Sequence, residues 1–137
     1  MLYFAYGMNT NSYEMALRCP TAISLGSAFL LDAEFRFAGH ADIVACDNGV
    51  VDGVLWDITD DDLKSLDKLE GFPYYYDRTE FEVEHEGETV QAVAYFMNPG
   101  NSDAEPTTHY LEMLLEGYAE HGVSTHQIAA ALKECYA

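Results

Sequence analysis

One glutamate near the middle of the chain has several features of a proton-transferring residue. Glu70 ends a predicted helix, because Gly71 follows it as a helix-terminating residue and Pro73 prevents continuation. Leu63 and Leu66 precede it at helical spacing, so the glutamate lies on the same inward face. Burial beside the aromatic residues that follow, together with the negative end of the helix dipole, raises the pKa of a carboxyl group. Such a glutamate can serve as a general acid or base, whereas one that reaches water is an ordinary surface residue.

A second stretch that could bind a ligand is the turn Tyr6-Gly7-Met8-Asn9. It follows a short apolar strand, and a helix is predicted to begin after it at Asn11, with Glu14 three residues on. Gly7 permits a positive φ and lets a ligand approach the backbone closely. Unpaired backbone N–H groups at such a turn can bind a carboxylate or an oxyanion, and the residues leave both possibilities open.

The elements around these two stretches predict a small barrel or a strongly curled sheet. The central helix begins after Thr59, whose spacing to Asp62 is that of a capping box. Turn signals occur at 47–49 and 86–88, and two amphipathic helices follow, the last capped by Ser124. Short strands at this spacing are typical of barrels. The predicted strands are 2–6, 22–31, 34–37, 41–45, 50–58, 79–84 and 89–97.

Composition limits the class of protein. The 137 residues suit a single domain, 1–137, and no apolar run approaches the roughly 18 residues of a membrane span. The net charge of −18, from 24 acidic against 6 basic residues, argues against nucleic acid or an anionic membrane as a partner. The acids are scattered along the chain, which is typical of a soluble acidic domain.

Neither a secretory signal nor a cofactor motif is evident. Cys19, Cys46 and Cys135 show no paired spacing, so we expect buried free thiols and a cytoplasmic protein. The sequence contains no glycine-rich nucleotide loop, no Gly-x-Ser-x-Gly elbow and no histidine pair with zinc spacing. We therefore expect neither a metal nor a cofactor.

Four segments between residues 4 and 118 form a pattern that resembles one family. They are Phe4-Ala5-Tyr6-Gly7-Met8-Asn9, Gly53-Val54-Leu55-Trp56-Asp57-Ile58, Leu66-Asp67-Lys68-Leu69-Glu70-Gly71 with Tyr76 and Arg78, and Pro106-Thr107-Thr108-His109-Tyr110 with Gly117-Tyr118. Together they resemble the γ-glutamylcyclotransferase-like proteins, which include the AIG2-like and butirosin-pathway branches. The likeness covers nearly the whole chain.

The resemblance implies an α+β fold, a small mixed β-barrel with flanking helices. It also implies conversion of a γ-glutamyl amine or γ-glutamyl amino acid to 5-oxoproline with release of the free amine, without metal or cofactor. Glu70 matches the family's catalytic glutamate, and Tyr6, Gly7, Met8 and Asn9 match its substrate-binding turn. Met8 stands where the family usually has serine, so its effect depends on whether that position acts through its backbone or its hydroxyl.

Further expectations concern the substrate. Tyr76 and Tyr110 are candidate hydroxyl contacts to a small-molecule γ-glutamyl substrate. The acidic chain favours cationic leaving amines, because a negative surface potential attracts them. The oligomeric state is not implied.

Two alternatives remain. One is a non-catalytic γ-glutamyl-binding module on the same scaffold, because a fold does not guarantee an activity. The other is an acidic interaction protein that binds a basic partner. Scattered acids and an inward Glu70 weigh against the second.

Overall fold

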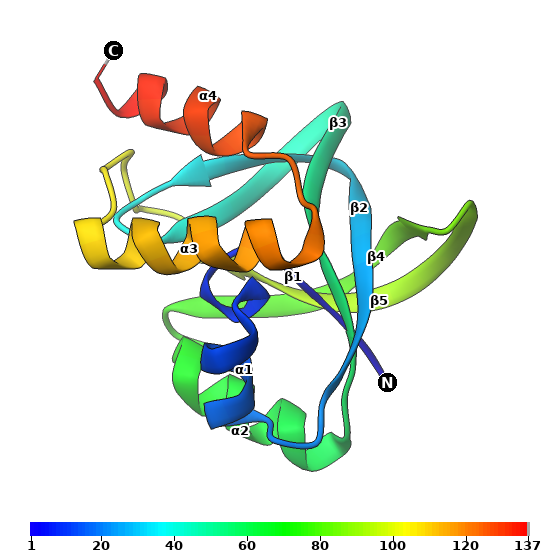
Figure 1. The fold of residues 1–137 in the computed structure, drawn as a ribbon. Coiled ribbons are helices and arrows are strands. Elements are labelled where there is room, and N and C mark those ends of the chain that lie inside the picture. Colours follow the sequence, from blue (N-terminus) through cyan, green and yellow to red (C-terminus); the bar gives the residue numbers. More distant parts are fainter. Residues whose placement is uncertain (137) are drawn as a thin grey trace.

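Five strands close into a mixed barrel in this computed structural model, which describes residues 1–136. The strands are Leu2–Ala5 (β1), Ile23–Phe37 (β2), Ala41–Asp57 (β3), Tyr76–His85 (β4) and Glu88–Met97 (β5). Their order around the barrel is β1-β3-β2-β4-β5, and Figure 1 labels the five strands. Neighbours are antiparallel except β1 and β5, which run parallel where Tyr3 pairs with Val93. The expected small mixed barrel is confirmed.

The long strands β2 and β3 replace four shorter strands predicted in this region. The turn predicted at 47–49 is wrong, because these residues continue β3. The β2–β3 register shifts between Leu31 and Ala33, where Asp32 and Asn48 have φ values of 59° and 64°. The Asn48 N–H donates to Asp32 Oδ1 at 3.1 Å. Asparagine and glycine therefore mark a bulge in a continuous ladder here, since a bulge needs the same positive φ as a tight turn.

Four α-helices and one short 3₁₀ helix flank the barrel. They are Met8–Thr10 (η1, the 3₁₀ helix), Ser12–Arg18 (α1), Asp60–Glu70 (α2), Thr108–His121 (α3) and His126–Cys135 (α4). Figure 1 shows α1 and α2 together at one end of the barrel, while α3 and α4 lie against another side. The N-cap of α4 is Thr125 rather than the expected Ser124, whose Oγ accepts a hydrogen bond from the His126 N–H at 3.2 Å.

A chain of buried hydrogen bonds ties α4 and α3 to the end of β1. Gln127 Nε2 donates to the Tyr118 hydroxyl at 2.7 Å, and that hydroxyl donates to the Tyr6 carbonyl at 2.7 Å. Tyr118 is fully buried. Because buried polar groups are costly unless paired, this chain fixes the position of the residues that follow β1.

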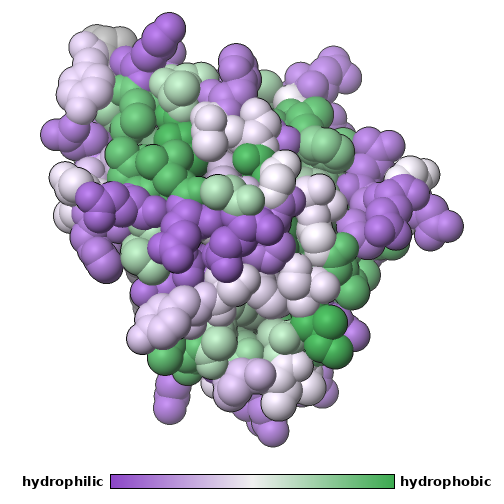
Figure 2. Space-filling model, in the orientation of Figure 1, coloured by the Kyte–Doolittle hydropathy of each residue, from purple (hydrophilic) through white to green (hydrophobic). Residues whose placement is uncertain are grey.

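The surface is polar over much of the face in Figure 2, where hydrophobic residues form separate patches between hydrophilic ones. Cys19 is buried as expected, whereas Cys46 and Cys135 are partly exposed. Across residues 1–136, no helix is both long and apolar enough to span a bilayer.

Candidate active site

Glu70 is placed by a helix with two well-defined ends. At the N-terminus of α2, the Asp62 N–H donates to Thr59 Oγ1 at 3.1 Å and the Thr59 N–H donates to Asp62 Oδ2 at 3.0 Å. This is the predicted capping box. At the other end Gly71 has the left-handed conformation, with φ of 66°. Leu66 is fully buried one turn before Glu70, so the helix presents Glu70 toward the barrel.

The turn after β1 meets Glu70 from the opposite side. Gly7 leads into η1, and the Thr10 hydroxyl donates back to the Gly7 carbonyl at 2.8 Å. Gly7 does not use the positive φ that glycine permits, since its φ is −111°. Glycine is required there for space, because a Cβ would lie 2.9 Å from the Tyr110 hydroxyl and 3.3 Å from Ala41 Cβ. Asn11 caps α1 as predicted, accepting from the Glu14 N–H at 3.2 Å.

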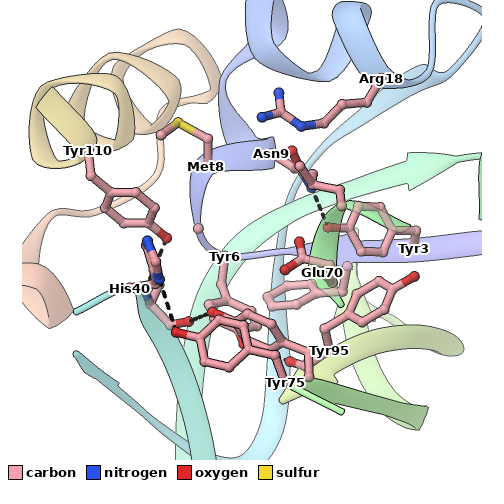
Figure 3. Close-up of a pocket in the computed structure, with 15 residues that line it drawn as sticks. Tyr3, Tyr6, Met8, Asn9, Arg18, His40, Glu70, Tyr75, Tyr95 and Tyr110 are labelled. Carbon is pink, nitrogen blue, oxygen red and sulfur yellow. Dashed lines mark hydrogen bonds between the residues drawn. The ribbon is translucent and has the colours of Figure 1, made fainter. Parts of the chain in front are cut away.

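One cavity of about 230 Å³ brings these segments together. Every candidate residue from the sequence lines it: Tyr6, Gly7, Met8, Asn9, Glu70, Tyr76 and Tyr110. Figure 3 shows the Glu70 carboxylate directed into the space between Asn9, Tyr6 and Tyr110. The cavity is smaller than the roughly 300–1,000 Å³ of pockets for drug-sized ligands, which favours a small metabolite.

Tyr76 and Tyr110 hold the same peptide segment from two directions. The Tyr76 hydroxyl donates to the Ala41 carbonyl at 2.6 Å, so its proton is already used. The Tyr110 oxygen accepts from the Ala41 N–H at 3.0 Å. A hydroxyl that accepts a hydrogen bond still has its own proton to donate. Tyr110 is therefore the tyrosine that can offer a proton to a ligand.

The surroundings of Glu70 favour its neutral form. Burial raises the pKa of this half-buried carboxyl from 4.5 to about 7, and the nearby Arg18 guanidinium acts in the opposite direction. Burial also raises the pKa of Tyr3, Tyr6 and Tyr110, and the charge of Glu70 adds to the effect. These phenols remain protonated hydrogen-bond donors near neutral pH.

Arg78 does not hold Glu70. Its Nε donates to Asp67 Oδ1 at 2.8 Å, and its Nη2 donates to Asp67 Oδ2 at 3.2 Å. The Tyr95 hydroxyl also donates to Asp67 Oδ1 at 2.7 Å. A salt bridge between Glu70 and Arg78, one way to explain the glutamate as structural, is therefore excluded.

Several wall residues were not found from the sequence. They are Tyr3, Phe4, Arg18, His40, Ala41, Leu69, Tyr75 and Tyr95. His40 and Tyr75 lie on the side of Glu70 away from Arg18, as Figure 3 shows, with 3.0 Å between His40 Nδ1 and the Tyr75 hydroxyl. One usable signal was Arg18, which lies one helical turn after Glu14 and is one of only six basic residues. Across residues 1–136, no three His, Cys, Asp or Glu side chains cluster closely enough to hold a metal ion.

Comparisons with known proteins show the family of the chain. The family model for "Gamma-glutamyl cyclotransferase, AIG2-like" matches residues 3–114. The γ-glutamylcyclotransferase of Bos taurus is 31% identical over 89% of this chain and 72% of its own length. The human γ-glutamylcyclotransferase is likewise 31% identical over the same shares.

Solved structures give the same result. A structure of a γ-glutamyl cyclotransferase has a TM-score of 0.82 and 29% identity, over 89% of this chain and 80% of its own. YkqA from Bacillus subtilis, at 22% identity, shares the fold with a TM-score of 0.83 over 100% of this chain and 54% of its own. The chain belongs to the AIG2-like γ-glutamyl cyclotransferase family.

Proposed function

We propose that this protein is a γ-glutamyl cyclotransferase that uses Glu70 as its general acid and base. The substrate is a γ-glutamyl amine or γ-glutamyl amino acid. Its α-amine nitrogen forms a bond to the γ-carbonyl carbon, the γ-amide C–N bond breaks, and the products are 5-oxoproline and the free amine. No oxidant, reductant or second substrate enters this balance.

Glu70 carries protons from the α-nitrogen to the leaving nitrogen. The α-ammonium group can attack only after losing a proton, which the Glu70 carboxylate accepts and then gives to the leaving nitrogen as the γ-amide C–N bond breaks. The ring nitrogen loses its second proton by the same route, so the amine is released in its ammonium form and Glu70 returns to the carboxylate. A group with a pKa of about 7 is suited to both steps near neutral pH, because it gains and loses a proton there at little cost. This carboxyl, at the wall of a small cavity, is the observation that carries the proposal.

The other side of the cavity suits the developing oxyanion. As the ring closes, the γ-carbonyl oxygen becomes negative and needs a donor aimed at it. The Tyr110 proton has that role in our proposal, because the oxygen that carries it already accepts from the Ala41 N–H and its own proton is left for a ligand. The folded substrate adds a proximity term, which can reach roughly 7–11 kcal/mol in well-oriented intramolecular reactions.

A panel of γ-glutamyl compounds tests the proposal. The purified protein is incubated with γ-glutamyl derivatives of neutral, acidic and cationic amines, and 5-oxoproline release is measured. We expect release from at least one class, with a preference for cationic amines given the net charge of −18. Binding without release by the whole panel would favour the non-catalytic binding module instead.

A further inference from the structure

Arg18 is the one lysine or arginine among the described residues that lines the cavity. The two other arginines are paired elsewhere, Arg36 with Asp42 and Arg78 with Asp67. The whole protein carries a net charge of −18, and Glu70 adds a carboxyl group to the same cavity. A substrate with a free carboxylate could enter such a site only against repulsion, unless a cation in the cavity compensates for it.

The guanidinium of Arg18 is held in a defined orientation by the helix that carries it. Its Nη1 donates to the Glu14 carbonyl oxygen at 2.7 Å and to Glu14 Oε2 at 2.7 Å. Arg18 is the last residue of α1, so this contact fixes the side chain at the end of the helix that follows the binding turn. Because the group is already fixed, binding a ligand costs less side-chain entropy.

Two polar atoms at this end of the cavity have no partner within residues 1–136. They are Arg18 Nε, a donor, and Asn9 Oδ1, an acceptor. Asn9 is only 4% exposed, and its Nδ2 donates to the Tyr3 hydroxyl at 3.1 Å, which turns Oδ1 toward Arg18. Figure 3 shows Arg18 above Asn9, both on the side of Glu70 opposite His40 and Tyr75. Buried polar atoms are nearly always paired, so an unpaired donor and acceptor together indicate a place for a ligand.

We infer that Arg18 and Asn9 form the subsite for the α-amino acid head group of the substrate, with Arg18 binding the α-carboxylate and Asn9 Oδ1 accepting from the α-amine. The inference rests on the proposed function and adds the residue that selects for a free α-carboxylate. The α-amine then lies between Asn9 and Glu70, which takes its proton. The γ-carbonyl extends toward Tyr110, and the leaving amine toward His40 and Tyr75.

This order of groups assigns different tasks to the two ends of the cavity. Arg18 affects recognition of the head group, whereas Glu70 and Tyr110 act on the bonds that change. The charge of Arg18 acts on Glu70, in agreement with its position at this end. Replacing the α-carboxylate of the substrate by a carboxamide should therefore weaken binding only where Arg18 is present.

The test compares two substrates and three proteins. One substrate is an L-γ-glutamyl amide with a free α-carboxylate, and the other is the same compound with an α-carboxamide. Amine release is measured for the parent, Arg18→Gln and Lys64→Gln, which removes one positive charge from an exposed site outside the cavity. In Arg18→Gln we expect KM for the free acid to rise about 10- to 100-fold, the range for a lost bond to a charged group, with KM for the carboxamide little changed. In Lys64→Gln the preference should equal that of the parent.

Two further measurements keep the outcome clear. Thermal unfolding shows whether Arg18→Gln is folded. If Arg18→Gln is not folded, Arg18→Lys takes its place; this variant keeps the charge and should retain part of the preference for the free acid over the carboxamide. Calorimetric binding of both compounds to Glu70→Gln, with and without Arg18→Gln, tests recognition without turnover. Parent turnover with unchanged preference in Arg18→Gln, or equal loss for both compounds, overturns the inference and leaves the cyclotransferase proposal standing. If the parent releases no amine but binds the free acid in an Arg18-dependent way, the subsite inference stands and the cyclotransferase proposal is overturned. If the parent neither binds nor turns over these compounds, the inference and the cyclotransferase proposal are both overturned.

Discussion

Glu70→Gln separates a catalytic role from a structural one, because glutamine keeps the size of the side chain but cannot exchange the proton. Loss of a general base typically costs about 10²–10⁴-fold, so 5-oxoproline release should fall by at least that range. In the parent, kcat/KM should rise with pH through about 7, as Glu70 loses its proton and becomes the base. That rise should be missing from any residual activity of the variant.

The same substitution should stabilise the fold above neutral pH. Burial raises the pKa of Glu70 from 4.5 to about 7, so the folded protein prefers the protonated form. Below about pH 4.5 the carboxyl is neutral in both states and has no effect. Between pH 4.5 and about 7 the carboxyl ionises in the unfolded chain but not yet in the folded protein. The free energy of unfolding therefore falls by about 1.4 kcal/mol per pH unit, roughly 3 kcal/mol in all. Glu70→Gln removes this penalty, so its stability advantage should be absent at pH 4 and near its maximum at pH 8.

Two measurements on one preparation decide the matter. Release of 5-oxoproline gives the catalytic effect, and the thermal midpoint at pH 4, 6 and 8 gives the stability effect. Glu116→Gln is the matched control, because this glutamate is exposed on α3 and lies outside the cavity wall. Undiminished turnover by Glu70→Gln would refute the catalytic assignment, whatever the family membership. A lower midpoint at pH 8 would refute the account of its pKa.

Further substitutions test the parts that position the site. Gly7→Val should reduce turnover by about 10²-fold, because its Cβ would lie 2.9 Å from the Tyr110 hydroxyl and displace it, whereas Met8→Ser should keep turnover; equal rates for both variants would contradict this. Thr59→Ala should lower the free energy of unfolding by about 1 kcal/mol in urea titrations through loss of the cap, and an unchanged midpoint would argue against it. Gly117→Ala should cost about 1–3 kcal/mol and also reduce turnover, since its Cβ would meet Thr10 Oγ1 at 2.4 Å and push α3 from the binding turn; unaltered unfolding would show that the turn adapts.

The sequence predicted what depends on neighbouring residues. The capping box at Thr59, the stop at Gly71 and the cap at Asn11 all lie within a few residues of the groups they bind, so short patterns were sufficient. Gly7 is required for a reason beyond its own turn, since a Cβ there would meet the Tyr110 hydroxyl, about a hundred residues away in the chain. No local pattern could indicate that contact.

The errors arose where one local conformation has two uses. The residue types Asp47-Asn48-Gly49 predicted a turn, whereas Asn48 takes its positive φ in a bulge opposite Asp32 within a continuous ladder. Pairing with β2 decides between these outcomes, and pairing is not visible in a short segment. Arg18 could be singled out by the scarcity of basic residues and its spacing from Glu14, but only the closed fold brings it to the cavity that Asn9 and Glu70 also line.

In the proposed reaction the site must meet two electrostatic requirements that conflict. Recognition of an α-carboxylate by Arg18 would need its positive charge, but a cation beside Glu70 lowers the pKa of that carboxyl and would weaken it as a base. The structure reconciles them through Glu14, whose carboxylate accepts from Arg18 Nη1 at 2.7 Å and offsets part of its charge. The remaining positive field is weaker than the effect of burial, so the pKa of Glu70 stays near 7 while donors of the guanidinium remain for the substrate. Binding and proton transfer can therefore share one small cavity, because α1 supplies both the cation and the carboxylate that moderates it.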